Sequence, residues 1–129
     1  MRDTLAIPAE LSQLEPVRTW VVDHLIVAGI DEPVLLDVQL AVTEAVANVV
    51  RHTFGGSDGS IEVELVLVDG MLRLVITDDG PPWDGTVPSP AEDGAGGYGV
   101  PLIEEVMDTV EHQMLEPAGN RLTLEKRVC

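Results

Sequence analysis

The chain has 129 residues, and its 7 Lys and Arg against 23 Asp and Glu give a formal net charge of −16 at pH 7. A surface this acidic repels nucleic acid and anionic lipid, so we expect no nucleic-acid partner, no membrane partner, and a basic face on any protein partner. The length predicts a single domain, residues 1–129, that is large enough to bury a core of its own.

The composition also predicts a cellular compartment. Cys129 is the only cysteine of the sequence, so no intramolecular disulfide can form. The first residues lack the charged and then apolar pattern of a signal peptide. We expect no apolar run of membrane-spanning length, because Asp23 and His24 interrupt the best candidate, residues 21–30. We therefore expect a cytoplasmic protein.

The first third of the chain predicts a strand and a helix. Residues 4–7 predict a short strand that ends at Pro8, and Ser12 with Glu15 forms a capping-box pattern that predicts a helix start. This helix is expected to stop at Gly29. Its apolar residues recur at helical spacing: Leu14, Val17, Val21, Leu25 and Ala28. We expect one face of it to pack and the other to face water.

Residues 31–54 predict the central helix, with Asp31 as its N-cap and Pro33 in its first turn. Apolar residues surround this helix on nearly all sides, which is typical of a buried helix. They are Val34, Leu35, Leu36, Val38, Leu40, Val42, Val46, Val49 and Val50.

Three polar residues occupy the second half of this helix. Glu44, Asn48 and His52 are spaced by four, so they are expected to lie on one face. Burying such groups without partners costs roughly a few kcal/mol each, so the pattern indicates a polar site inside the domain. The alternative is that Glu44 and Asn48 face solvent on a one-sided helix.

Two strands are predicted next, over residues 61–68 and 71–77. Asp69-Gly70 between them is a strong signal for a tight hairpin turn. Glu62 and Glu64 alternate with apolar residues, which predicts one wet face and one dry face. Helices must cover the dry face.

The last third begins with residues 85–97, which are rich in proline, glycine and acid and predict no regular element. The run Gly94-Ala95-Gly96-Gly97-Tyr98-Gly99 precedes a helix with Pro101 near its start. Its expected inward residues are Leu102, Ile103, Val106 and Met107. Residues 109–115 and 121–127 predict two strands joined by a turn at 116–119.

Several of these residues could bind a nucleotide. Glycines at a helix start leave backbone amides free for an anion, and the helix N-terminus adds partial positive charge. Asp78 at a strand end could accept a hydrogen bond from an exocyclic amine, or be an ordinary turn residue. Asn48 could supply one of the oxygen ligands that Mg²⁺ prefers, and Glu44 could orient or deprotonate a nucleophile.

Three short patterns occur in a set order and carry a resemblance. They are Glu44-x-x-x-Asn48 with Arg51-His52, then Asp78-x-Gly80, then Gly97-x-Gly99 heading the helix at 102–108. Together they resemble the N, G1 and G2 boxes of the GHKL ATP-binding superfamily. Residues 44–52 and 99–112 are most similar to the bacterial anti-sigma factor serine kinases. The resemblance covers essentially the whole chain.

The resemblance implies an α+β fold, a two-layer α/β sandwich of the Bergerat (GHKL) type. Its sheet would be mixed and mostly antiparallel, with helices on one face. ATP would lie between the helix layer and a lid at about residues 85–98. The chain has Pro82 where the G1 box usually has a second glycine, and residues 88–98 contain no Lys or Arg.

The resemblance also implies roles for single residues. Asn48 would be the Mg²⁺ ligand, Glu44 the catalytic carboxylate and Asp78 the acceptor for the adenine amine. Gly80, Gly97 and Gly99 would allow close approach of the backbone to ATP. The other residues expected to bind the cofactor are Arg51, His52, Pro82, Gly94, Gly96, Tyr98 and Val100.

By the same resemblance, the chain would be a homodimer that binds a sigma factor and phosphorylates a serine on an anti-anti-sigma (STAS-type) antagonist protein. Two alternatives stay open. One is a nucleotide-responsive binding module without catalysis, and the other is the detached ATP-binding half of a histidine kinase.

Overall fold

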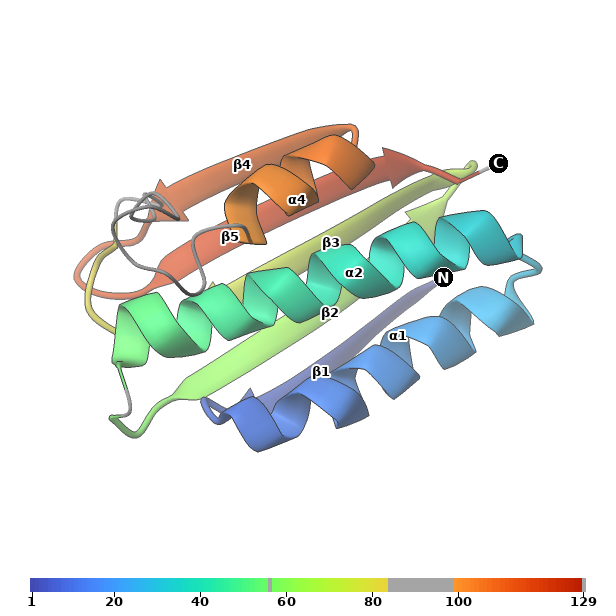
Figure 1. Ribbon diagram of the computed structural model, residues 1–129. Coiled ribbons are helices and arrows are strands. Elements are labelled where there is room, and N and C mark those ends of the chain that lie inside the picture. The colour runs from blue at the N-terminus through green and yellow to red at the C-terminus, as the bar shows by residue number, and fades with distance from the viewer. Residues whose placement is uncertain (56, 84–98, 129) are drawn as a thin grey trace.

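The computed structural model describes residues 1–55, 57–83 and 99–128 of the chain. Its sheet has five strands in the order β1-β2-β3-β5-β4 (Figure 1). All four strand pairings are antiparallel, where the resemblance had allowed a mixed sheet. The strands are β1 Arg2–Pro8, β2 Ser60–Val68, β3 Met71–Asp78, β4 Thr109–Met114 and β5 Asn120–Arg127.

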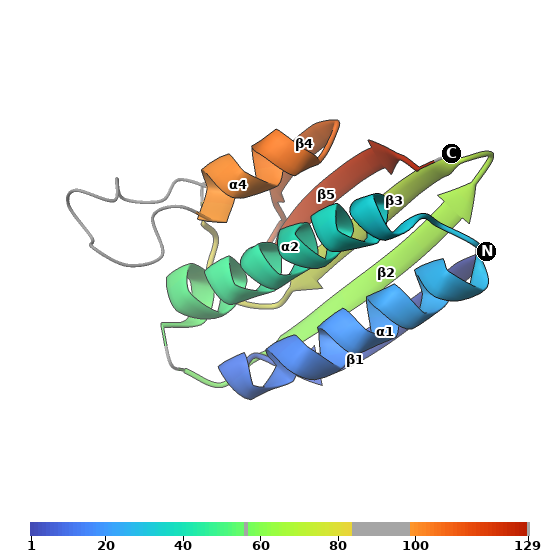
Figure 2. The ribbon, with the colours of Figure 1, turned by 45° about the vertical axis from the view of Figure 1, so that its right-hand side comes forward.

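The helices form the second layer. They are α1 Leu14–Val27, α2 Glu32–Asn48 and α4 Gly99–Val106. A 3₁₀ turn, Leu11–Gln13, precedes α1, and a π-helical segment, Val49–Phe54, continues α2. The three α-helices lie on one face of the sheet, with α2 between the other two (Figures 1 and 2). The expected two-layer α/β sandwich with helices on one face is confirmed.

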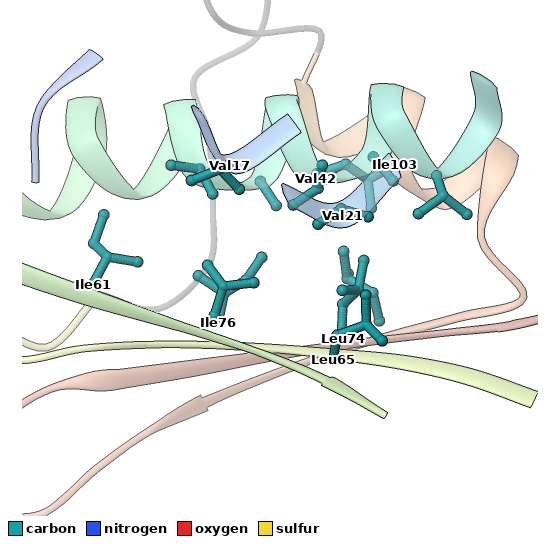
Figure 3. Close-up of a cluster of buried hydrophobic side chains, with 14 of the residues drawn as sticks. Val17, Val21, Val42, Ile61, Leu65, Leu74, Ile76 and Ile103 are labelled. Carbon is teal, nitrogen blue, oxygen red and sulfur yellow. The ribbon is translucent and has the colours of Figure 1, made fainter. Parts of the chain in front are cut away.

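Alternation along the strands builds the core between the two layers. Apolar side chains of β2 and β3 point toward the helices and meet side chains of α1, α2 and α4 (Figure 3). Those labelled in Figure 3 are each at most 1% exposed: Val17, Val21, Val42, Ile61, Leu65, Leu74, Ile76 and Ile103. Fully burying one such side chain stabilises the fold by about 1.5–3 kcal/mol.

The turn between β2 and β3 has the predicted conformation. Asp69 has φ 52° and Gly70 has φ 75°, as a two-residue turn with both central residues left-handed requires. Because the turn fixes the register, Ile61 pairs with Asp78 at the far end of the hairpin.

The predicted capping box at the start of α1 is wrong. Ser12 lies inside the 3₁₀ turn, and its hydroxyl donates to a Glu10 carboxylate oxygen at 3.3 Å. The N-cap of α1 is Gln13, which makes no side-chain capping bond. The extra turn of 3₁₀ helix moves the helix start beyond the position from which Ser12 could cap it. Asp31 is the N-cap of α2, as predicted, but its side chain makes no capping bond either.

The central helix is more deeply buried in its second half than in its first. Leu36, in the first half, is 57% exposed, whereas Ala41, Val42, Ala45 and Val46 are fully buried. The reason is that α2 belongs to a single helix layer, so a face that neither the sheet nor a neighbouring helix covers meets solvent.

The expectation that no apolar run reaches membrane-spanning length is also wrong. Residues Glu32–Phe54 form a helix long and apolar enough to cross a membrane by length and composition alone. Half of its most apolar window is buried inside the domain, as the core helix of a two-layer domain requires.

Replacing Leu74 by Ala should lower the free energy of unfolding by about 2–5 kcal/mol, because Leu74 is fully buried between the layers. Replacing the 57%-exposed Leu36 by Ala should change it by no more than about 0.5 kcal/mol. Urea denaturation followed by circular dichroism measures both. Equal losses would contradict the placement of the two residues.

Candidate functional site

The fold gathers the ends of several elements at one end of the molecule, opposite the two chain termini. The end of α2, the end of β3, the start of β5 and the start of α4 lie there (Figures 1 and 2). The β3–β5 register places Asp78 beside Asn120. The loop after β3 packs on the π-helical segment, because a Cβ on Gly80 would overlap Cγ2 of Thr53.

Buried polar atoms without partners collect at this end. Asn48 is 2% exposed, and neither its Oδ1 nor its Nδ2 has a hydrogen-bond partner among the described residues. The same holds for Oγ1 of Thr53 and Oδ2 of Asp78. Leaving such an atom unsatisfied costs about 1–3 kcal/mol. Asn48 and Asp78 therefore do not face solvent, and a polar ligand would recover the cost of burying them.

The π-helical segment begins directly after Asn48 and ends at Phe54, and the N–H of the following Gly55 donates to the Val50 carbonyl at 3.0 Å. Segments of this kind occur frequently at functional sites. His52 lies within this segment, and its Nε2 is buried without a hydrogen-bond partner among the described residues, as the Asn48 amide is. Phe54, the last residue of the segment, is buried against Gly59 and Gly80, since a Cβ on either glycine would overlap its ring.

Asp78 is 5% exposed and ends β3. Its Oδ1 accepts a hydrogen bond from the Gly80 N–H at 2.9 Å and another from Nδ2 of Asn120 at 3.1 Å. Burial raises the pKa of Asp78 above its ordinary value, and these two hydrogen bonds oppose the rise. Oδ2 is left without a partner among the described residues, so the carboxylate offers one acceptor to a ligand.

Asn120 holds the loop that follows Asp78. Besides its bond to Asp78, its Nδ2 donates to the Pro81 carbonyl at 2.9 Å, and its Oδ1 accepts from the Trp83 N–H at 2.8 Å. The Gly119 N–H donates to the Gly80 carbonyl at 2.9 Å. The start of β5 therefore fixes the loop from Gly80 to Trp83.

Trp83 contacts two imidazoles. Its ring stacks on His52, with ring centroids 5.7 Å apart and an angle of 18° between the planes. It also meets His112 of β4 edge-on, with centroids 5.3 Å apart and an angle of 77°. The three rings come from the π-helical segment, the loop after β3 and β4, so they form an aromatic wall beside the end of β3.

Three other predicted site residues, on the helix layer and on the loop after β3, differ in burial. Glu44 is half-buried, one helical turn before Asn48, and makes no hydrogen bond or ion pair with the described residues. Arg51 is exposed and also makes neither within that part of the chain. Pro82 is exposed on the loop that Asn120 holds.

Four predicted residues lie outside the described part of the chain: Gly94, Gly96, Gly97 and Tyr98. Gly99 and Val100 are described as the first residues of α4. The expected lid at residues 85–98 lies entirely within residues 84–98, which the structure does not describe.

Sequence reasoning missed Asn120, Trp83, Thr53 and His112. Trp83 had a signal, because it is one of only 4 aromatic Phe, Trp and Tyr residues and stands in a proline-rich loop. Asn120 had none, because its partner Asp78 lies 42 residues away. Only the strand register brings the two together.

The residues present fit a magnesium–nucleotide ligand. The orphaned Oδ1 of Asn48 is the kind of hard oxygen atom that Mg²⁺ prefers. The orphaned Oδ2 of Asp78 is an acceptor suited to an amine on a base. A hollow of about 520 Å³ lies elsewhere, on the helix-free face of the sheet between residues such as Glu62, Arg73 and Arg121. None of the unsatisfied buried atoms found in the described residues belongs to that hollow.

Comparison with known proteins shows the family to which the chain belongs. Residues 7–126 match the family described as the histidine kinase-like ATPase domain. The chain is 32% identical over 120 residues to the serine-protein kinase RsbW of Listeria monocytogenes serotype 4a (strain HCC23), which covers 84% of this chain and 76% of that protein. It is 28% identical over 132 residues to the anti-sigma F factor of Clostridium botulinum (strain Eklund 17B / Type B), covering 95% and 82%.

Solved structures share the fold. The structure of the RsbU and RsbW domains of Rv1364c from Mycobacterium tuberculosis aligns with a TM-score of 0.71 at 24% identity, over 98% of this chain and 32% of that one. The chain therefore spans about a third of that protein. The catalytic domain of the histidine kinase ThkA aligns with a TM-score of 0.59 at 13% identity, over 98% and 97% of the two chains. At these identities the likeness concerns the fold.

The family match and the relatives agree with the three boxes in the sequence. The match over residues 7–126 covers nearly all of the chain, and its named relatives include a serine-protein kinase and an anti-sigma factor. The family expected from the boxes is thereby confirmed: the chain belongs to the histidine kinase-like ATPase domain family, and within it to the group that resembles the anti-sigma factor serine kinases.

Proposed function

We propose that this chain is an ATP-dependent protein-serine kinase that also acts as an anti-sigma factor in the cytoplasm. It would bind a sigma factor and phosphorylate a serine on an anti-anti-sigma (STAS-type) protein, as a homodimer. The observation that carries the proposal is that the amide of Asn48 and Oδ2 of Asp78 are buried without hydrogen-bond partners among the described residues. The names of the relatives, an RsbW kinase and an anti-sigma F factor, support the choice of reaction and partners.

In this proposal each side chain has one task. Asp78 accepts a hydrogen bond from the adenine amine through Oδ2, and Asn48 holds the metal through Oδ1. Mg²⁺, when bound, offsets the negative charge of the phosphate oxygens. Glu44 accepts the proton of the attacking serine hydroxyl. The serine oxygen forms a bond to the γ-phosphorus as the bond to ADP breaks, and ADP leaves.

The acidity of the chain fits protein partners with basic surfaces. With a formal charge of −16, the domain would attract a basic face on a sigma factor or an antagonist and speed their association. Association of this kind weakens as salt screens the charges.

The second candidate is a nucleotide-responsive binding module without catalysis. No Lys or Arg occurs between Arg73 and Arg121, a span that includes Asp78 and the whole expected lid. Backbone amides and Mg²⁺ would then neutralise the phosphate charge without a basic side chain from this span. Such a site can bind nucleotide without transferring the phosphoryl group, so a measurement of phosphoryl transfer distinguishes the two candidates.

Asn48→Ala should lower the affinity for Mg²⁺-ATP at least tenfold, about 1.4 kcal/mol, because the metal loses its amide ligand. The fold should survive without loss of stability, since the amide has no partner among the described residues. Isothermal titration calorimetry measures the affinity. Thr43→Ala is the control, because it removes a side-chain hydrogen bond from the same helix without touching the site. Unchanged Mg²⁺-ATP affinity in Asn48→Ala would make Asn48 a structural residue.

Asp78→Asn should weaken ATP more than GTP, because a carboxylate only accepts hydrogen bonds whereas an amide can donate toward the guanine carbonyl. The raised pKa of Asp78 also fixes a sign for stability. Its favourable contribution is complete below the ordinary carboxyl pKa and is lost as the pH rises through the raised value. Without nucleotide, the variant should therefore be at least as stable as the wild type at neutral pH. Equal losses of ATP and GTP affinity would remove Asp78 from base recognition.

Glu44→Gln decides between the two candidates. The variant keeps the shape of the side chain and removes its charge, so nucleotide and partner should still bind. Phosphoryl transfer should fall about a hundredfold to ten-thousandfold. The assay is transfer of label from γ-labelled ATP to an antagonist protein captured from the source cell with Mg²⁺-ATP. A wild type that binds its captured partner but transfers nothing to it would leave the binding module as the function.

A further inference from the structure

Asn120 connects Asp78 to the loop carrying Trp83. It is 2% exposed, and both of its polar atoms form hydrogen bonds. Nδ2 donates to Oδ1 of Asp78 at 3.1 Å and to the Pro81 carbonyl at 2.9 Å. Oδ1 accepts from the Trp83 N–H at 2.8 Å. Only an amide supplies two donors and an acceptor from one short side chain, so neither Asp nor Ser could replace all three bonds.

The first consequence concerns the orientation of the carboxylate. Asn120 and the Gly80 N–H both bind Oδ1 of Asp78, which fixes the plane of the carboxylate and leaves only Oδ2 for a ligand. A freely rotating carboxylate would lose entropy on binding, whereas this one is already oriented. One fixed acceptor selects a ligand with a donor at that point.

The second consequence concerns the loop. Pro81 and Trp83 are tied to Asn120 by their backbone atoms, and the Trp83 ring lies against His52 and His112. The backbone at Asn120 is fixed in turn by Gly119, whose φ is +101° and where a Cβ would approach the Asp78 carbonyl to 2.6 Å. Strand β5 thus positions the acceptor and the aromatic wall together.

We propose that Asn120 is a positioning residue that sets the selectivity of the site for a base with an exocyclic amine, by orienting Asp78 and the loop up to Trp83. This inference rests on the proposed nucleotide site and names a residue that determines its specificity. Asn120 does not touch the base; it acts through Asp78.

The experiment compares two ligands that differ only in the amine: ATP, and purine riboside triphosphate, which lacks the amine. The wild type should prefer ATP by about tenfold to a hundredfold, the range of a hydrogen bond to a charged group. Asn120→Ala should reduce that preference to about twofold or less, while the affinity for purine riboside triphosphate changes little. Titration calorimetry on the full chain with Mg²⁺ measures all affinities.

Two further variants complete the design. Asn120→Leu has nearly the same shape but no polar atom, so it cannot donate to Asp78 at any pH and should also lose the preference for ATP. It decides the matter if Asn120→Ala does not fold. Arg121→Ala is the matched control, because Arg121 is the next residue of β5 and is exposed on the helix-free face. It should keep the wild-type preference.

The outcomes separate this inference from the proposed function. If the wild type prefers ATP and the folded Asn120 variants keep that preference, the positioning role is overturned while the nucleotide site stands. A folded variant that loses both ligands equally would make Asn120 a scaffold residue and also overturns the role. A wild type that binds neither ligand overturns the proposed function itself.

Discussion

The packing of α2 against the covered face of the sheet is the constraint on which the site depends. The helix can bury its second half only by taking Asn48 out of water with it, because Ala47 and Val49 on either side are also buried. The core that α2 shares with β2 and β3 supplies the apolar burial that offsets this cost. An amide that has no hydrogen-bond partner among the described residues is therefore kept buried by the same contacts that hold the two layers together.

The end of β3 repeats this arrangement with a different group. The carboxylate of Asp78 is buried at the point where the strand leaves the sheet, and its unsatisfied Oδ2 lies at the same end of the fold as the amide of Asn48. Such groups weaken a domain that has no ligand and strengthen its complex with one. A ligand that bonds these atoms should accordingly raise the stability of the folded protein.

Much of the fold could be predicted from the sequence because the signals were local. The Asp69-Gly70 turn, the alternation in β2 and the glycine after α1 each depend on neighbouring residues, and the structure has all three. The capping box failed because a 3₁₀ turn displaced the helix start, which periodicity does not reveal. The prediction of one helix over residues 31–54 did not show that its last residues are π-helical, because the same residues also suit an α-helix.

The candidate site was predictable only in part. Asn48 and Asp78 stood out because each is polar beside an apolar run, but the support for Asp78 comes from Asn120, across a strand pairing that no local pattern specifies. The roles assigned to Asn48, Asp78, Glu44 and Arg51 all stay predictions, and the side chains of Glu44 and Arg51 form no hydrogen bond or ion pair within the described part of the chain.

Phe54 gives the site a mechanical property. The only phenylalanine of the chain is buried between Gly59, just before β2, and Gly80, just after β3, with no room for a Cβ on either. The end of the helix layer, the start of one strand and the turn beyond another must then shift as one rigid piece. A ligand that binds Asp78 meets a backbone that is already ordered, so little conformational entropy is lost on binding. Differences in affinity among ligands should therefore depend mainly on how well their chemical groups fit the site.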